Sequence, residues 1–363
     1  MKPTSLYLEK SYQAERTSQN LQNHEQPALA GKAKQAFDGF EPAPSKAWAF
    51  AETGSGQSNP LAPKDSQGNG VQLNKKDSWC DPASPKPTSG YKVPENCELF
   101  GDKHVRASDV VQGALANCYF ISTLAALAEK KPTFVRGMIK EIGENQYAVR
   151  FYHEGKPKWV KVDGDLPQMF SRPEPLYAKT SDSDKDGRPE IWAPLIEKAY
   201  AKFREQYPLP GKEDRKGYQS LHFGHAHIAY EALTGLKGTR VELVDALDET
   251  LPAALNTFFR PNRQNDLWNF ACAANRGHPV VAGTGDFSEN PHKKICAGLV
   301  GRHVYTVLKT FTRNGERFVQ LRNPWGSGEP RLNHDDTNDG VFIMRWSDFM
   351  KAFSQLSGGA RYS

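Results

Sequence analysis

Apolar and polar residues follow two different periods in the middle of the chain. Residues 117–130 place apolar side chains at every third or fourth position, which predicts a helix, and residues 191–203 repeat this spacing. Between them, residues 146–152 and 158–164 alternate apolar and polar side chains, which predicts two neighbouring strands. Pro194 is compatible with the second helix only in its first turn, where a missing backbone N–H costs nothing.

Strand patterns dominate after residue 235. Short segments rich in β-branched and aromatic residues lie at 279–284, 303–311, 317–323 and 340–346. The Asn314-Gly315 pair between the second and third of these predicts a tight hairpin. Helical patterns are prominent in the first half of this region and strand patterns dominate the second. This order predicts an α+β fold with two lobes.

The first 90 residues have a different composition. They contain a single valine, Val71, and no isoleucine, and they are rich in Pro, Gly, Ser, Asn and Gln. Such a segment cannot bury enough apolar surface to offset its ordering entropy. We therefore expect a largely disordered leader over residues 1–91, with a short helix at about Gly31–Phe40. A helical subdomain over 92–224 and a β-rich subdomain over 225–357 follow it.

Charge and cysteine content narrow the class of protein. The 363 residues include 47 basic and 42 acidic side chains, and the bases form no stripe of the kind found in nucleic-acid-binding proteins. The sequence contains no run of about 18 apolar residues, so no membrane span is predicted. The N-terminus lacks the apolar core of a standard secretory signal. Five scattered cysteines indicate free thiols in a reducing compartment. We expect no nucleic-acid partner, no membrane span, and a cytoplasmic location or export without a standard signal peptide.

Cys118 is the first candidate for chemistry. It opens the helix predicted at 117–130, where unpaired N–H groups and the helix dipole favour a thiolate of lowered pKa. A thiolate is the form of cysteine that attacks a carbonyl carbon. Gln112 precedes it on the approach loop and offers a side-chain N–H for an oxyanion. Taken alone, buried packing of the cysteine and an exposed loop position for the glutamine are the commoner explanations.

His303 and Asn323 begin and end the predicted hairpin. A histidine that accepts a thiol proton needs a group that fixes its ring, and asparagine can be that group. A two-residue loop at 314–315 pairs residue 313 with 316 and turns Asn323 to the face opposite His303. A three-residue loop pairs residue 313 with 317 and brings both side chains to one face. The catalytic interpretation therefore predicts a bulged three-residue turn.

These residues stand in segments that resemble the protease core of calpains in order and spacing. The segments are QGALANCYF (112–120), EIWAPLIEKAYAKF (190–203), GRHVYTVLK (301–309), LRNPWG (321–326) and DGVFIMRWSDFMKAF (339–353). Residues 218–235 are similar to the stretch that links the two calpain subdomains, so the resemblance covers roughly residues 92–357. It implies a papain-like fold with a helical lobe around Cys118 and a β lobe carrying His303 and Asn323.

The resemblance also implies a role for each residue. Cys118 would be the nucleophile, His303 the general base and acid, Asn323 the orienting group, and Gln112 the oxyanion-hole side chain. Trp325 would shield the imidazole from water at the substrate cleft, and the backbone of Gly224 would meet the substrate. The implied activity is that of a cysteine endopeptidase acting on protein or peptide substrates, with no cofactor required for the chemistry.

The chain departs from the calpain pattern beside both catalytic positions. Asn117 replaces the aspartate that usually precedes the cysteine, and Arg302 replaces the glycine that precedes the histidine. Two alternatives therefore stay open: a calpain fold that binds without cleaving, and acyl transfer to an amine by the same residues. The compact core without accessory domains resembles bacterial members, which suggests an effector or toxin. A polar leader beside a protease cleft suggests self-processing.

Two segments contain residue types that can bind metal ions. Asp182, Asp184, Asp186 and Gly187 begin like a calcium-binding EF-hand loop, but its twelfth position is Ala193 instead of a glutamate. Glu190 and Asp339 match calpain calcium ligands, whereas Val341 replaces another. We expect a solvated acidic loop, with calcium at these partial sites as the alternative and not essential. His222, His225 and His227 lack a fourth ligand nearby, so zinc is not expected.

Overall fold

The computed structural model describes residues 81–82, 89–101, 105–169, 174–182, 185–243, 263–288, 290, 292, 295, 297–330 and 337–359. The predicted leader, apart from its last few residues, and the helix predicted at Gly31–Phe40 lie outside the described residues. So do Cys80, Cys296 and Asp184.

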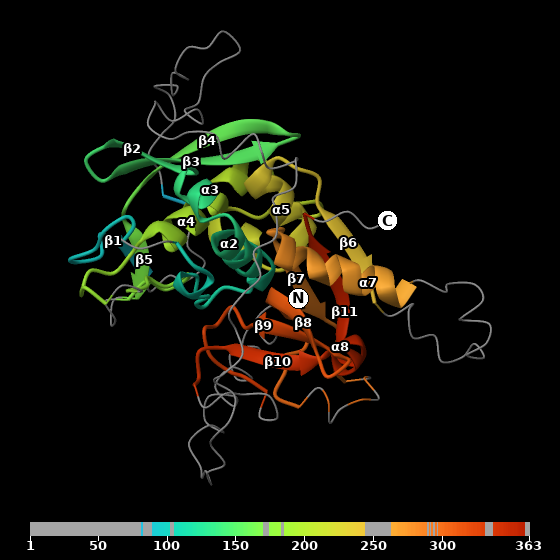
Figure 1. The fold of residues 1–363 in the computed structure, drawn as a ribbon. Helices are drawn as coiled ribbons and strands as arrows, with labels where there is room; N and C mark the ends of the chain where they lie inside the picture. The colour runs from blue at the N-terminus through green and yellow to red at the C-terminus, as the bar shows by residue number, and fades with distance from the viewer. Residues whose placement is uncertain are drawn as a thin grey trace, which may run out of the picture. The chain divides into compact units, whose positions relative to one another are not determined.

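The first lobe packs helices against a small sheet, drawn in green to yellow in Figure 1. β2 (Ile139–Gly143), β3 (Gln146–His153) and β4 (Lys156–Asp163) form an antiparallel three-stranded sheet, and β1 (Ser89–Lys92) pairs with β5 (Leu166–Met169). The helices are α2 (Cys118–Lys130), α3 (Pro132–Arg136), α4 (Trp192–Gln206) and α5 (Ala226–Thr234), with 3₁₀ turns η3 (Ala107–Asp109) and η4 (Gly217–Leu221). The predicted helices and hairpin of this half are confirmed, and Pro194 lies in the first turn of α4.

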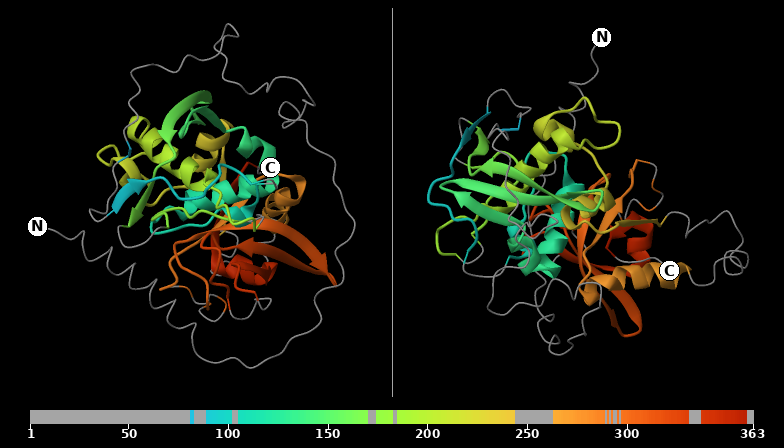
Figure 2. Two further views of the ribbon diagram at one scale, coloured as in Figure 1. Left: turned by 90° about the vertical axis from the view of Figure 1, so that its left-hand side faces the viewer. Right: turned by 90° about the horizontal axis from the view of Figure 1, so that it is seen from above.

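The second lobe is built on one six-stranded sheet in the order β10-β9-β8-β7-β11-β6. Its strands are β6 (Thr239–Glu242), β7 (Val280–Thr284), β8 (Val304–Arg313), β9 (Glu316–Arg322), β10 (Val341–Arg345) and β11 (Phe353–Gly358). They pack with α7 (Arg263–Ala271), η6 (Cys272–Arg276) and α8 (Trp346–Ala352). The views in Figure 2 show the orange and red strands grouped apart from the green sheet. The α+β prediction is confirmed.

Two apolar cores correspond to the two lobes. One contains α2, α4 and α5 and includes a stacked pair, Phe120 and Tyr200, with ring centroids 4.0 Å apart. The other fills the space between the six-stranded sheet and its helices, where Trp268 meets Trp346 edge to face. Each lobe therefore buries its own apolar surface, while the boundaries at 91 and 224 remain predictions.

Helix α2 lies where the lobes meet and hydrogen-bonds to β8. Ser122 Oγ donates to the Val304 carbonyl at 2.7 Å, and Thr306 Oγ1 donates to the Ser122 carbonyl at 3.0 Å. All four groups are buried, so each would be costly to leave unpaired. This reciprocal pair places the start of α2 beside the start of β8.

The hairpin of β8 and β9 corrects the predicted turn. Asn314 and Gly315 form a two-residue loop with positive φ angles of 52° and 77°, and Arg313 pairs with Glu316. The prediction of a three-residue turn is therefore wrong. The extra residue lies instead inside β8, where the register shifts between Val307 and Lys309.

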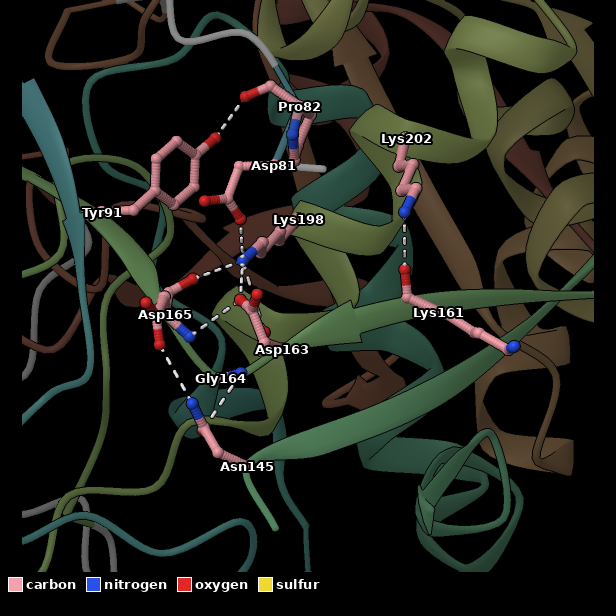
Figure 3. A network of polar contacts seen from close by, with 10 residues as sticks. All are labelled: Asp81, Pro82, Tyr91, Asn145, Lys161, Asp163, Gly164, Asp165, Lys198 and Lys202. Carbon is pink, nitrogen blue, oxygen red and sulfur yellow. Dashed lines mark hydrogen bonds and ion pairs between the residues drawn. The ribbon is translucent and has the colours of Figure 1, made fainter. Parts of the chain in front are cut away.

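A buried ammonium group holds the chain upstream of β1 against the first lobe, as Figure 3 shows. Lys198 on α4 is 1% exposed and lies 2.5 Å from carboxylate oxygens of Asp163 and Asp81. It also donates to the Asp165 carbonyl at 2.7 Å, and it lies 4.9 Å from the ring centroid of Tyr91. The Tyr91 hydroxyl donates to the Pro82 carbonyl. These contacts fix Asp81 and Pro82 to the body of the protein.

No helix among the residues described is both long enough and apolar enough to cross a membrane.

Candidate active site

Cys118 is the first residue of α2, and it keeps part of its surface exposed. Its thiol lies against the backbone of Val304, the residue that follows His303, and against the backbone of Tyr119 at its own helix start. The preceding residue, Asn117, does not cap the helix with its side chain. It donates instead to buried Glu197 on α4, at 2.7 Å.

The thiol has a raised pKa, which corrects the expectation of an easily formed thiolate. Burial raises the pKa of Cys118 to about 11, and the hydrogen bonds from the backbone offset only part of that effect. The helix start contributes about half an elementary charge, and its effect is small beside the cost of removing a thiolate from water. Cys118 therefore carries its proton at neutral pH in this structure.

His303 and Asn323 lie on one face and touch. His303 Nε2 is 3.0 Å from Asn323 Oδ1, and both side chains are buried. The orientation of the Asn323 amide is determined by its other partners, because Oδ1 accepts the Trp325 N–H and Nδ2 donates to the Gly328 carbonyl. An amide oxygen only accepts, so His303 Nε2 carries the proton and Nδ1 keeps its lone pair.

Two aromatic rings enclose the imidazole. The Trp325 ring lies 4.8 Å from the ring of His303, and Tyr305 meets the His303 ring edge to face at 5.1 Å. Burial lowers the pKa of His303 to about 4, while the contact with Asn323 acts in the opposite direction. The imidazole is therefore neutral at pH 7 and can accept a proton.

Gln112 connects the two lobes beside this pair. Its backbone N–H donates to the Pro324 carbonyl at 2.8 Å, next to Asn323 in the chain. Its side-chain Nε2 donates to the Leu115 carbonyl at 2.6 Å, so one amide hydrogen is already used and one is left for an oxyanion. Its Oε1 is buried without a hydrogen-bond partner.

Gly224 packs directly against the residue after the cysteine. A Cβ on Gly224 would lie 2.5 Å from the ring of Tyr119, which no side chain could accommodate without movement. The preceding residue, Phe223, donates its N–H to the Ala116 carbonyl at 2.8 Å. The segment around Gly224 therefore runs alongside residues 116–119, at the start of α2.

The carboxylates of the partial calcium sites accept hydrogen bonds from the protein. Asp182 accepts the backbone N–H groups of Asp186 and Gly187, and Glu190 accepts the indole N–H of Trp192. Asp339 accepts the N–H of Val341 at 2.9 Å. Among the described residues no three His, Cys, Asp or Glu side chains are grouped so that they could hold a metal ion.

His222, His225 and His227, which were not expected to bind zinc, are not grouped around a common point. The rings of His225 and His227 lie 5.6 Å apart, and His225 Nδ1 is 3.1 Å from the guanidinium of Arg240. His222 contacts the ring of Phe223 at 6.1 Å. A guanidinium beside an imidazole opposes binding of a cation there.

Sequence reasoning missed two contributors to this site. Tyr305 follows His303 by two positions in a strand, so the period of two could have identified it as a neighbour on the same face. Its hydroxyl accepts the Val300 N–H at 2.9 Å and steadies the segment before His303. The contact of Asn117 with Glu197 joins segments 80 residues apart and leaves no local pattern.

Comparison with known proteins gives consistent matches. A model of the calpain family cysteine proteases matches residues 84–331. The calpain-type cysteine protease DEK1 of Arabidopsis thaliana is 27% identical over 280 residues, which are 72% of this chain and 12% of that protein. Calpain-13 of Rattus norvegicus is 25% identical over 74% of this chain and 40% of its own length. Calpain-7 of Sus scrofa is 28% identical over 61% of this chain and 25% of its own. The chain thus spans less than half the length of these relatives.

Proposed function

Because the chain belongs to the calpain family of cysteine proteases, we propose that it is an endopeptidase that hydrolyses protein substrates through Cys118, His303 and Asn323. The observation that carries the proposal is the 3.0 Å contact of His303 Nε2 with Asn323 Oδ1. This contact leaves Nδ1 of His303 free as a base. The Cys118 thiol lies against the backbone of Val304, the residue that follows His303. A nucleophile, a base and an orienting group are the parts of a cysteine protease site.

Acylation starts from a neutral thiol and a neutral imidazole. His303 Nδ1 takes the proton of Cys118 as sulfur attacks the peptide carbonyl carbon. The Cys118 backbone N–H and the second amide hydrogen of Gln112 stabilise the oxyanion. The imidazolium then protonates the leaving amine, the C–N bond breaks, and a thioester remains. Asn323 holds the ring in one orientation throughout.

Deacylation uses the same groups in reverse. His303 removes a proton from water, and the hydroxide oxygen attacks the thioester carbonyl. The tetrahedral species collapses, the C–S bond breaks, and the proton returns to sulfur. Trp325 covers one side of the imidazole and limits access of bulk water to its contact with Asn323.

Cleavage of casein tests the proposal. Wild type should produce fragments, Cys118→Ala should not, and Cys272→Ala, which removes another half-buried thiol, should behave as wild type. Equal cleavage by Cys118→Ala would refute the assignment. An inactive wild type would favour the non-cleaving alternative. Incorporation of a fluorescent primary amine into casein without fragments would favour acyl transfer.

We further propose that the chemistry requires no metal ion and survives excess EGTA. The support is that the carboxylates of Asp182, Glu190 and Asp339 already accept hydrogen bonds from the protein. Complete loss of casein cleavage with the chelator, restored by micromolar calcium, would contradict this.

The leader is proposed as a substrate of the enzyme itself, with cuts between about Gly54 and Gly90. Asp81 is held by Lys198, so we expect the cuts to lie upstream of it. Purified wild type should shorten with time, whereas Cys118→Ala should stay at full length. Intact wild type that still cleaves casein would contradict self-processing.

A further inference from the structure

We propose that Phe223 selects substrates by contacting an apolar side chain of the bound polypeptide close to the scissile bond. This inference rests on the proposed peptidase function and adds a residue that determines its specificity.

The first observation is exposure. The side chain of Phe223 is 65% exposed, more than any other large apolar residue in the described part of the chain. Val93, Leu236 and Ile142 are exposed to 51%, 43% and 38%. A phenyl ring in water forgoes the burial that would stabilise the fold, and exposed aromatic rings are common where a partner binds.

The second observation is the backbone. Phe223 has a φ of 57°, in the left-handed region that glycine adopts readily and that a bulky residue adopts at a cost. Such residues persist where the surroundings impose the conformation, and they concentrate at functional sites. Here the surroundings do impose it. The Phe223 N–H donates to the Ala116 carbonyl at 2.8 Å, and Lys212 Nζ donates to the His222 carbonyl at 2.6 Å.

The third observation is location. Ala116 precedes Cys118 by two residues, and Gly224 packs against the ring of Tyr119, which follows Cys118. The segment that carries Phe223 thus contacts residues on both sides of Cys118 in the chain. A polypeptide whose carbonyl carbon reaches the Cys118 thiol is therefore expected to pass this segment close to the bond that is cut.

Two substitutions separate selection from folding. Phe223→Gly removes the ring at a position where glycine relieves the backbone cost, so the variant should melt no lower than wild type. Phe223→Leu keeps an apolar side chain. Ile142→Ala removes an exposed apolar group from β2 and serves as the control.

The experiment is cleavage of a proteome-derived peptide library, with the cut sites identified by mass spectrometry. Wild type should show enrichment of large apolar residues at one fixed position near the cut. In Phe223→Gly this enrichment should fall roughly 10-fold. That is the change in binding expected when one apolar side chain of the substrate loses its partial burial. Phe223→Leu and Ile142→Ala should retain it. For a matched peptide pair, the loss in Phe223→Gly should appear in KM more than in kcat.

The outcomes distinguish the two proposals. Cleavage by wild type with an unchanged profile in Phe223→Gly would overturn the role of Phe223 and leave the peptidase function standing. Absence of any cleavage by wild type would overturn both.

Discussion

Alkylation of Cys118 by iodoacetamide at pH 7 is expected to be slower than alkylation of an ordinary cysteine. The helix start alone predicts the reverse, a thiol more reactive than the others. The structure shows that burial raises the pKa of Cys118 to about 11 and lowers the pKa of His303 to about 4. Both groups are therefore neutral at pH 7, and the reactive thiolate is rare.

The magnitude follows from these pKa values. With a pKa of about 11, about one Cys118 in 10⁴ is a thiolate at pH 7, against about 3% for a cysteine with the ordinary pKa of about 8.5. The fractions differ by about 300-fold. A more basic thiolate is also more nucleophilic, and over ~2.5 pKa units this returns about 10-fold. The net expectation is alkylation roughly 30-fold slower than that of a free cysteine.

The assay is a rate profile between pH 5 and pH 9, read from the mass of the tryptic peptide that contains Cys118. The rate should rise about tenfold per pH unit over this range. The same peptide from the urea-unfolded chain is the matched control and should react at the rate of free cysteine. His303→Ala should change the rate little, because a neutral imidazole does not stabilise the thiolate.

A different profile would refute the reasoning. A rate above that of the unfolded chain, flat from pH 5 to pH 8 and abolished by His303→Ala, would show a thiolate–imidazolium pair in the free enzyme. The attraction between the two charges would then exceed the cost of burying them. Proton transfer would precede attack on the substrate instead of accompanying it.

Three further predictions follow from buried polar contacts. Asn323→Ala should lower kcat roughly 10- to 100-fold with little change in KM, because in the proposed mechanism Asn323 orients His303 and does not bind substrate; an unchanged kcat in peptide assays would contradict this. Lys198→Met should lower the free energy of unfolding in urea by about 3–5 kcal/mol, because Asp163 and two carbonyls lose their buried cation; a loss below about 1 kcal/mol would contradict it. Burial raises the pKa of Glu197 to about 7, so the folded state holds a proton that the unfolded state releases. The contribution of protonated Glu197 to the free energy of unfolding is complete below about pH 4.5. It is lost as the pH rises to 7, and the loss is at most about 3 kcal/mol. Glu197→Gln should remove this slope from stability measured against pH, and an unaltered slope would assign it to another group.

Elements with a strong local pattern were predictable from the sequence. Helix α2 and the β3–β4 hairpin each show an apolar period that the structure confirms. Their side chains pack into the core of the first lobe, which also takes in Val281 and Val304 of the second. Periodicity located both elements but not their burial, because α2 is buried on all sides from Tyr119 to Ala128 and β3 buries four consecutive residues.

Strands that complete the six-stranded sheet were not predictable in this way. β11 reads Phe-Ser-Gln-Leu-Ser-Gly and β6 reads Thr-Arg-Val-Glu, and neither has a clear apolar alternation. They form because β11 pairs with β7 on one side and with β6 on the other, across long stretches of sequence. The pKa of Cys118 was missed for a related reason, since burial depends on the packing of both lobes and not on the residues beside it.

The contact of His303 with Asn323 depends on one residue that no local pattern marks. With the observed two-residue turn, an uninterrupted ladder would pair His303 with Gly326 and place Asn323 opposite Thr306, on the wrong face. The register shift between Val307 and Lys309 inserts Leu308 as an extra residue. The shifted register pairs Thr306 with Arg322, so the next position, Asn323, falls opposite Tyr305 and therefore on the face of His303. A β-bulge is a regular means of redirecting side chains next to active sites. The geometry of the candidate base is thus determined in the middle of β8 and not at the turn, where sequence reasoning looked for it.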